Sequence, residues 1–390
     1  MEILQLSSDS QQVPYGYPRE TMRKTKTPID CAATDSAAQD KAPIARADRR
    51  VTSYDVAMLA GVSQSAVSRC FKPGASVSKA TYARVMKAAA GLDYIPNAAA
   101  RSLITRRSNM VAVVISQLAN LYYPEALAEL SQQIARRGKR VLLFTMQNES
   151  DVDAILADIW QYQVDGAIVA AALTPAQIGE FERRRLPLVV FNRNLRGTSV
   201  SSVLCDQYDA GRLLASKLAG AGHRRFGIIA GPADSPVATE RRNGAVDRLH
   251  ELGLPAPSIA SGQFDYASGA HGLRQIIAAL GDVPDAVICG NDVMAIGCLD
   301  CARHELGIDV PGRMSVAGFD AVEPSNWLSY NLTTLRQPIH NMALAAADLL
   351  TSMIEAQELH GCAGEKRLFA PQFVEGATAR LAALPASLAA

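Results

Sequence analysis

What the 390-residue chain lacks excludes several classes of protein. No stretch is apolar for long enough to cross a bilayer, and the N-terminus has no apolar core of the kind that defines a secretory signal peptide. Seven cysteines without such a signal indicate a reducing compartment rather than a disulfide framework. We therefore expect a cytoplasmic protein with no membrane partner.

Motifs for catalysis and cofactor binding are missing too. No GxGxxG opens a predicted helix, and the segment 231–244 lacks the GK[ST] ending of a P-loop. No Ser/His/Asp set or carboxylate pair is spaced for catalysis. The pair Cys298-x-x-Cys301 has no second pair or histidine at ligand spacing, so buried apolar cysteines are favoured over a zinc or redox site. We expect no enzyme activity, no cofactor and no metal.

The chain has a net charge of only +1, but its charged residues are unevenly distributed along the sequence. Segment 51–107 holds eight Lys/Arg and two Asp/Glu, a net +6, so the remaining residues sum to −5. Basic charge gathered in one small module is the expected footprint of a nucleic-acid phosphate contact. Residues 1–50 are rich in Ser, Gln, Ala, Asp and Lys without apolar periodicity, which predicts a disordered N-terminal extension.

Segment 51–71 predicts two short helices joined by a tight turn at Ala60-Gly61-Val62. Thr52 and Ser63 are suited to cap the two helices by accepting backbone N–H groups, and Gly61 ends the first because glycine tolerates positive φ. The positions expected to face inward are Val56, Leu59, Ala60, Val67 and Phe71. The second helix then presents polar side chains that suit base edges and phosphates, namely Gln64, Ser65, Ser68 and Arg69. The alternative is an ordinary helical hairpin with a solvated polar face.

The basic module continues beyond this hairpin. Ser78 is expected to cap a third helix from Lys79 to about Ala90, and its packing positions are Ala83, Val85, Met86 and Ala89. Tyr94-Ile95-Pro96-Asn97 then begins an alanine-rich helical segment that is too short to be stable alone. Such a segment folds only when it docks.

The pattern VT-x-x-DVA-x-x-AGVS-x-x-x-VSR, followed by VS-x-x-T-x-x-RV and YIPN-x-x-AR-x-L, resembles the lactose/galactose repressor family of bacterial transcription regulators. The resemblance extends over nearly all of 51–376. It implies that Gln64, Ser65 and Arg69 read the DNA major groove in a dimer or tetramer. Positions implied to contact the DNA backbone are Thr52, Tyr54, Ser63, Ser68 and Ser78.

The same resemblance makes Asn97–Ile104 a hinge helix, with Asn97 and Arg101 flanking a leucine that enters the minor groove. Leu103 would wedge into a base step, which costs a few kcal/mol and is offset by the contacts of bent DNA. A simple contact between two helices is the alternative role for Leu103.

From residue 110 onward, β-rich runs alternate with amphipathic helical stretches, which is typical of doubly wound parallel sheets. The expected strands are 110–115, 140–144, 166–169, 188–191, 226–229, 286–289 and 314–317. The expected helices are 124–137, 150–161, 208–220, 239–252, 268–280 and 293–306. This length exceeds one typical core, so two lobes are expected.

Ligands of such sheets bind at the carboxyl ends of the strands, often between lobes. The polar and aromatic residues just after strand ends are Asn120–Tyr123, Asn192-Arg193, Phe264, Asn291-Asp292 and Asp320, with Arg241 near a helix start. This set suits a polyhydroxylated ligand with a ring against an aromatic face. For Asn291 or Asp292 alone, capping of the following helix is an equal alternative.

The family resemblance implies a periplasmic-binding-protein-like domain of two lobes crossed by three strands. The effector residues implied by its motifs and by the strand-end rule are Asn120, Tyr122, Tyr123, Asn192, Arg193, Arg241, Phe264, Asn291, Asp292, Asp320 and Gln337. Ser235 and Val237 stand where a purine-binding member has polar anchors, which argues against a purine effector.

The expected organisation is an α/β protein with an N-terminal helix-turn-helix headpiece. Its parts are an extension at 1–50, the DNA-binding domain at 51–96, a hinge and linker at 97–109, an effector domain at 110–380 and a tail at 381–390. Within the effector domain, the first lobe spans about 110–206 and the second about 207–335 plus a C-terminal strand.

The expected function is a transcriptional repressor whose operator affinity is controlled by a sugar, a sugar acid or a similar polar ligand. A solute-binding transport protein and a sugar-processing enzyme are the alternatives. Whether the effector releases or recruits DNA binding stays open.

Overall fold

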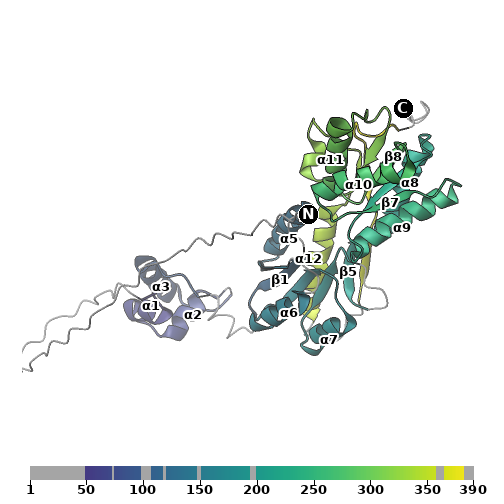
Figure 1. Ribbon diagram of the computed structural model, residues 1–390. Helices are drawn as coiled ribbons and strands as arrows, with labels where there is room; N and C mark the ends of the chain where they lie inside the picture. Colours follow the sequence, from purple (N-terminus) through teal and green to yellow (C-terminus); the bar gives the residue numbers. More distant parts are fainter. Residues whose placement is uncertain are drawn as a thin grey trace, which may run out of the picture. The chain divides into compact units, whose positions relative to one another are not determined.

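The computed structural model describes residues 49–72, 74–97, 107–116, 120–146, 151–193, 199–356 and 364–381. These residues form two compact units, which divide between Tyr94 and Ile95 (Figure 1). The first unit is entirely helical, and the second combines three sheets with helices. None of the helices in the described ranges is long and apolar enough to cross a membrane.

The small unit consists of α1 (Ser53–Ala60), α2 (Gln64–Cys70) and α3 (Lys79–Gly91). Gly61 has φ 63° and ends α1 as predicted. Ser63 Oγ accepts the Ala66 N–H at 3.3 Å, and Ser78 Oγ accepts the Thr81 N–H at 3.2 Å, so both predicted caps are confirmed. Each side-chain oxygen satisfies one amide that has no partner within its helix.

Thr52 caps α1 as predicted, and it does so together with Asp55 in a capping box. Its hydroxyl donates to Asp55 Oδ2 at 2.7 Å, and the same carboxylate oxygen accepts the Thr52 backbone N–H at 2.8 Å. The side chains of Thr52 and Asp55 thus both take part in capping the first turn, which is the capping-box arrangement.

The core of the small unit contains Val56, Val67 and Val85, as predicted. Leu59 is 55% exposed, and Ala83 is exposed as well, so both were wrong as core positions. The reason lies in the helical periodicity of α1. Its buried face is formed by Val56, Ala57 and Ala60, and Leu59 lies about 100° around the helix from the centre of that face.

The first lobe of the larger unit is a six-stranded sheet with the order β11-β5-β4-β3-β1-β2, in which every neighbouring pair is parallel. Its strands are β1 (Met110–Ser116), β2 (Arg140–Met146), β3 (Gly166–Ala170), β4 (Leu188–Phe191), β5 (Ser201–Cys205) and β11 (Lys366–Phe369).

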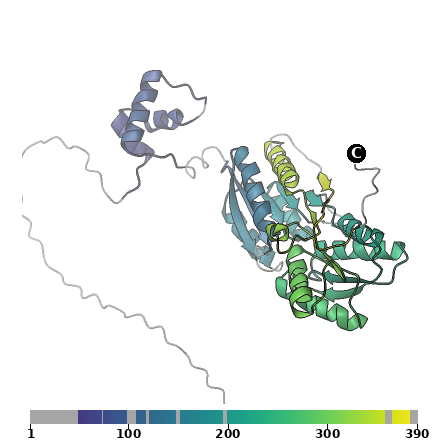
Figure 2. The ribbon, with the colours of Figure 1, turned by 90° about the horizontal axis from the view of Figure 1, so that it is seen from above.

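Helices cover both faces of this sheet. On one face, α5 (Tyr122–Arg136) and α12 (Ile339–Ala356) lie side by side and pack on Val111, Val113 and Ile115 of β1 (Figure 2). On the other face, α6 (Val152–Gln161) and α7 (Pro175–Arg183) pack on Ala112 and Val114. Successive β1 residues point to opposite faces, so a continuous apolar run serves two cores.

The second lobe is a parallel sheet with the order β7-β6-β8-β9, joined by an antiparallel pair β10-β12. Its strands are β6 (Phe226–Ala230), β7 (Ser258–Ser261), β8 (Ala286–Cys289), β9 (Ser315–Ala317), β10 (Thr334–Arg336) and β12 (Gln372–Val374). Helices α8 (Gln207–Gly220) and α9 (Pro236–Glu251) contribute to the core on one side, and α10 (Tyr266–Leu280) and α11 (Asp292–Asp300) contribute to the other. A π-helix, Cys301–Glu305, continues α11, and a 3-10 turn occupies Glu323–Asn326.

Helices α8 and α9 cross in backbone contact through two glycines. A Cβ at Gly211 would lie 2.1 Å from the Arg241 carbonyl oxygen, and a Cβ at Gly244 would lie 1.9 Å from the Tyr208 carbonyl oxygen. A side chain at either position would clash with the facing backbone. Glycine at both positions therefore allows the backbones of the two helices to come into direct contact. The Tyr208 hydroxyl donates to Asp247 Oδ2 at 2.8 Å across the same crossing.

The same arrangement recurs where α10 crosses α11. Cβ atoms at Gly269 and Gly297 would each lie 2.0 Å from a carbonyl oxygen of the facing helix, and Tyr266 donates to Asp300 Oδ2 at 2.9 Å. Both crossings therefore pair a Tyr-x-x-Gly segment with a Gly-x-x-Asp segment. The same glycine-mediated helix crossing therefore occurs twice in the second lobe, once on each face of its sheet.

The structure confirms the expected strands and helices between residues 110 and 317, with shifts of one to three residues at their ends. It adds two helices, α7 and α12, and four strands, β5, β7, β10 and β11. The strand β12, which pairs with β10, is the C-terminal strand expected for the second lobe. The segment expected as one helix over 293–306 instead changes from α to π geometry at Cys301.

Candidate functional site

The exposed side of α2 carries the side chains predicted to meet DNA. Ser63, Ser65, Ser68 and Arg69 are exposed, and Gln64 is half-buried with its Nε2 donating to Ser53 Oγ at 3.2 Å. Short hydroxyls and amides of this kind suit base edges and phosphates. The arrangement brings these five positions to the surface of one helix and the turn before it.

The neighbouring predicted backbone contacts lie around this helix. Tyr54 is 70% exposed on α1, Thr52 is half-buried in its capping network, and Ser78 is exposed at the start of α3. Asn97 is exposed at the end of the described range 74–97. Arg101, Leu103 and the rest of the predicted hinge up to Ile104 lie outside the described residues.

A pocket in the larger unit lies at the C-terminal ends of strands from both lobes. Its lining residues are Asn120, Tyr122, Tyr123, Asn192, Arg193, Asp234, Ser235, Val237, Arg241, Phe264, Asp320 and Gln337. The predicted set contributes every one of these except Asp234, Ser235 and Val237. Residues more than 200 positions apart in the chain thus meet where the strand-end rule places a ligand.

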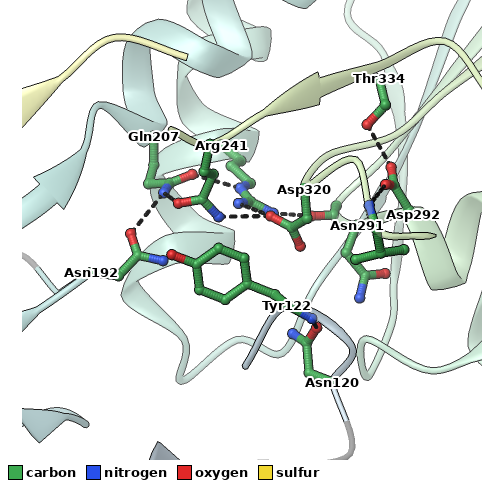
Figure 3. Close-up of polar contacts among 12 residues, drawn as sticks. Asn120, Tyr122, Asn192, Gln207, Arg241, Asn291, Asp292, Asp320 and Thr334 are labelled. Atoms are coloured by element: carbon green, nitrogen blue, oxygen red, sulfur yellow. Dashed lines mark hydrogen bonds and ion pairs between the residues drawn. The ribbon is translucent and has the colours of Figure 1, made fainter. Parts of the chain in front are cut away.

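Arg241 is the centre of a buried polar network (Figure 3). Its Nε donates to Gln207 Oε1 at 2.7 Å, Nη1 donates to the Gly290 carbonyl at 2.7 Å, and Nη2 bonds Asp320 Oδ1 at 2.6 Å. Its guanidinium also lies over the Phe319 ring at 4.7 Å. An arginine held by three acceptors in this way is a rigid part of the wall.

Amide side chains extend this network across the two lobes. Gln207 Nε2 donates to Asn192 Oδ1 at 3.1 Å and to Gln337 Oε1 at 3.0 Å. Gln337 Nε2 donates in turn to Asp320 Oδ1 at 2.8 Å. Asn192 follows a first-lobe strand and Arg241 lies on a second-lobe helix, so the hydrogen bonds of Gln207 connect the two lobes.

Backbone strain coincides with this site. Asn192 has φ 52°, Phe264 has φ 60° and Asp320 has φ 103°, and all three line the pocket. Non-glycine residues at positive φ are uncommon and tend to cluster at functional sites. The pocket walls are therefore held in conformations that the surrounding fold enforces.

Aromatic rings form the apolar walls. The rings of Tyr122 and Tyr123 pack edge to face at 5.3 Å, and the Arg193 guanidinium lies over the Tyr123 ring at 5.9 Å. On the opposite side, a Cβ at Gly231 would lie 2.4 Å from the Phe264 ring, so glycine makes room for that aromatic. Arg193 also donates to the Asn192 carbonyl at 3.1 Å and to Ser116 Oγ at 3.2 Å.

Asn291 and Asp292, which were predicted to contact the effector, do not line the pocket. Asn291 Oδ1 caps α11 by accepting the Met294 N–H at 2.9 Å, and its Nδ2 donates to the Phe264 carbonyl at 3.1 Å. The capping alternative accounts for Asn291, which also fixes the backbone that carries a pocket aromatic.

Asp292 is fully buried behind the pocket, where it accepts from Val322 N at 2.9 Å and from Thr334 Oγ1 at 2.5 Å. Burial, followed by the nearby charge of Asp320, raises the pKa of Asp292 well above its ordinary value of 3.8. Its two bonds hold the segment after Asp320 against β10, so Asp292 positions the pocket wall.

Sequence reasoning missed Gln207 altogether. This side chain is 3% exposed and contacts three residues of the network, yet it follows β5, a strand that was not predicted. Recognition of that strand would have placed Gln207 at a strand end, where the rule selects ligand residues. Asp234 was missed because it lies in the turn before α9.

The cysteines carry no reactive site in the part of the chain that the structure describes. Cys205, Cys289, Cys298 and Cys301 are buried free thiols. Burial raises the pKa of Cys301 to about 11, which keeps the thiol protonated. The described ranges contain no group of three or more His, Cys, Asp or Glu side chains placed to hold a metal ion.

Two sequence profiles match the chain. Residues 52–97 match bacterial regulatory proteins of the lacI family, and residues 215–378 match a periplasmic binding protein-like domain. The first range covers the helices that carry the exposed polar side chains, and the second covers most of the second lobe. The first match thus contains the candidate DNA-binding side chains, and the second contains the pocket residues of the second lobe, whereas Asn120, Tyr122, Tyr123, Asn192 and Arg193 lie before it.

Individual proteins are similar over most of the chain. The HTH-type transcriptional repressor CytR of Escherichia coli (strain K12) is 29% identical over 334 residues, which is 85% of this chain and 97% of that one. The HTH-type transcriptional repressor PurR of Yersinia pestis (strain Pestoides F) is 32% identical over 309 residues, 78% of this chain and 90% of that one. A structure of the lac repressor dimer bound to operator and the anti-inducer ONPF has a TM-score of 0.75 at 27% identity, covering 85% of this chain and 99% of that one.

Proposed function

Because the chain belongs to the lacI family of bacterial regulatory proteins, we propose that it represses transcription by binding operator DNA as a homodimer, and that a sugar, sugar acid or similar polar ligand between its lobes controls that binding. The proposal rests above all on one observation: the polar, strained pocket lies in the same chain as a helix-turn-helix with an exposed polar face. The relatives are repressors rather than enzymes.

The proposed DNA contacts are Gln64, Ser65 and Arg69 in the major groove. Thr52, Tyr54, Ser63, Ser68 and Ser78 would hold phosphates on either side. Exposure of the α2 side chains and the net +6 of segment 51–107 support these roles. The proposed domain boundaries remain 51–96 for DNA binding, 97–109 for the hinge with Leu103, and 110–380 for effector binding.

Self-association is supported by an exposed apolar surface on the second lobe. Leu328 is fully exposed and Trp327 is 53% exposed directly after the 3-10 turn at Glu323–Asn326. Large apolar side chains are rarely left this accessible side by side unless a partner covers them. A second copy of the chain is the proposed partner, because the lac repressor structure with this fold is a dimer.

The proposed control mechanism is a shift between two arrangements of the lobes. The pocket takes Asn192 and Arg193 from one lobe and Arg241 and Asp320 from the other, so a bound ligand stabilises the arrangement in which both sets reach it. A preference of about 1–3 kcal/mol for one arrangement changes operator affinity by roughly 5- to 150-fold. The hinge at 97–109 is the proposed connection to the DNA-binding domain, and the cytoplasm is the proposed location.

The test begins with selection of an operator from random DNA by the full chain. Fluorescence anisotropy then measures operator affinity with and without ligands that stabilise the protein. We expect Gln64→Ala and Arg69→Ala to lose sequence preference while the larger unit keeps its thermal stability. A chain that selects no sequence, or whose selected sequence binds equally well after both substitutions, would contradict the proposal.

A further inference from the structure

The last residues of the predicted hinge and linker, 97–109, are held on the first lobe by one carboxylate. Asp165 Oδ1 accepts the Ser108 backbone N–H at 2.8 Å and the Ser108 hydroxyl at 2.9 Å, and Oδ2 accepts the Asn109 N–H at 3.1 Å. The Asp165 N–H donates in turn to the Met110 carbonyl at 2.8 Å. Three consecutive residues at the start of β1 thus bond to the residue directly before β3.

Lys139 completes this group, which we call the linker anchor (Ser108, Asn109, Lys139 and Asp165). Lys139 Nζ bonds Asp165 Oδ2 at 3.0 Å, and the two side chains are 9% and 5% exposed. Lysine is almost never this deeply buried unless it is paired. Asn109 has φ 55°, a conformation that is uncommon for residues other than glycine and persists where the surroundings enforce it. The anchor therefore joins a buried ion pair to a backbone held in one conformation.

The second lobe holds one of its strands in a similar way. Asp285, directly before β8, accepts the backbone N–H groups of Arg224 and Arg225, both at 2.9 Å, directly before β6. Its side chain is 26% exposed, and its ion-pair partner Arg313 is 42% exposed. The segment that Asp285 holds connects α8 to β6 within one lobe, whereas the segment that Asp165 holds leads to the DNA-binding domain. The buried lysine distinguishes the anchor from its second-lobe counterpart.

Two elements of the first lobe extend from the pocket to the linker anchor. Helix α5 begins with Tyr122 and Tyr123, which line the pocket, and Lys139 lies three residues after its end. Strand β1 begins directly after Asn109 and ends at Ser116, whose hydroxyl accepts from Arg193 in the pocket wall. Rigid elements of this kind carry coupling between distant sites. The anchor is thus placed where a change at the pocket reaches the linker.

We propose that Asp165 and Lys139 are positioning residues for operator binding, which act by holding the linker on the first lobe without contacting DNA. This inference rests on the proposed repressor function and adds the residues through which the first lobe controls the linker. Without the anchor, Ser108 and Asn109 gain backbone freedom that operator binding must remove again. Fixing two residues anew is expected to lower operator affinity by about 10-fold or more.

The test compares the full chain with the double variant Lys139→Met/Asp165→Asn. The amide that replaces the carboxylate has one acceptor oxygen fewer, and substitution of both partners leaves no buried charge unpaired, so the variant is expected to fold. Fluorescence anisotropy on an operator selected by the wild-type chain should show affinity lower by about 10-fold or more. Affinity for a duplex of scrambled sequence at low salt should stay within about twofold, because it depends on the charge of the DNA-binding domain.

Asp285→Asn is the matched control in the second lobe. It should lower the urea midpoint and leave operator affinity unchanged, because the segment that Asp285 holds does not lead to the DNA-binding domain. A control that weakens operator binding as much as the double variant overturns the inference, since the effect would then be a general loss of stability. Ser108→Ala is a milder variant that removes one bond of the anchor, and it should weaken operator binding by about 2- to 10-fold.

Hydrogen exchange reports on the anchor directly. Peptides that cover Ser108 and Asn109 should exchange faster in the double variant, and unchanged exchange overturns the inference. Operator selection separates the inference from the proposed function. A wild-type chain that selects no sequence contradicts both. A wild-type chain that selects an operator, together with a double variant that binds this operator equally well, overturns the inference alone, and the repressor proposal stands.

Discussion

Substitution of Gly244 by alanine tests whether the backbone crossing of α8 and α9 holds the pocket together. The new Cβ would lie 1.9 Å from the Tyr208 carbonyl oxygen, whereas an ordinary carbon–oxygen contact is about 3.4 Å. The helices must therefore separate by about 1.5 Å to relieve the clash. The 2.7 Å bond between Arg241 Nε and Gln207 Oε1 spans the same two helices and would open beyond hydrogen-bonding range.

The expected loss of stability follows from three contributions. Overpacking costs about 1–3 kcal/mol, and the lost bond to a charged group costs about 1.5–3 kcal/mol. The better helix propensity of alanine returns about 1 kcal/mol. We expect Gly244→Ala to lower the free energy of unfolding of the second lobe by about 1.5–5 kcal/mol and to weaken ligand binding through the displaced Arg241.

The chain supplies its own controls for this substitution. Gly297→Ala creates an equivalent clash, 2.0 Å from the Tyr266 carbonyl oxygen, at the α10–α11 crossing, which does not hold Arg241. It should destabilise the lobe comparably and retain more ligand affinity. Gly179 lies inside α7, and a Cβ added there would meet no described atom within 4 Å, so Gly179→Ala should stabilise the protein by about 0.5–1 kcal/mol.

Urea unfolding followed by Trp327 fluorescence in a Trp160→Phe background reports on the second lobe, because these are the only two tryptophans in the sequence. Calorimetry with a ligand that raises the Tm of the protein measures binding. If Gly244→Ala unfolds at the same urea concentration as the wild type, the α8–α9 crossing tolerates a Cβ and does not hold the pocket. If Gly297→Ala loses as much ligand affinity as Gly244→Ala, the loss does not come from displacement of Arg241.

Three further predictions concern other parts of the chain. Arg241→Ala should destabilise the protein by about 3–5 kcal/mol in urea unfolding, because it leaves Asp320 buried and unpaired. Adding Asp320→Asn should recover part of that loss. Equal urea midpoints for the single and double variants would contradict the role of the unpaired Asp320 charge. Burial lowers the pKa of His223 below its ordinary 6.5, so the stability that neutral His223 contributes is present above pH 6.5 and lost as pH falls through the lower folded-state pKa. The urea midpoint of the wild type should therefore fall more steeply below pH 6.5 than the midpoint of His223→Gln. Parallel midpoint curves for the two proteins would argue against a depressed His223 pKa. Leu103→Ala should weaken operator binding in anisotropy titrations without changing ligand affinity, because it removes the side chain proposed to enter the minor groove. Unchanged operator affinity would show that Leu103 does not act as a wedge.

Sequence patterns located the headpiece well because its determinants are local. Ser63, Ser78 and Gly61 act within one turn of their own helices, so spacing alone identifies them. The prediction that Leu59 is buried was wrong, because the sequence of a single helix does not show which of its sides the neighbouring helices will cover. Ala57, a smaller residue, occupies the buried position instead.

The pocket was largely predictable because the carboxyl ends of parallel strands meet at one edge of a sheet, whatever the chain separation. What could not be predicted depends on contacts between distant segments. Gln207 was missed with the short strand β5, and the buried position of Asp292 depends on Val322 and Thr334, more than 25 residues away. Likewise, no local signal indicates that α12 packs on the first sheet.

Thermodynamic reciprocity tests whether the pocket and the DNA-binding helices are coupled. Affinity for a ligand that stabilises the protein is measured by calorimetry on the full chain, with and without saturating operator DNA. We expect operator to change ligand affinity by the same factor by which ligand changes operator affinity, within roughly 5- to 150-fold. Ligand affinity that is identical with and without operator would show that the two sites are not coupled.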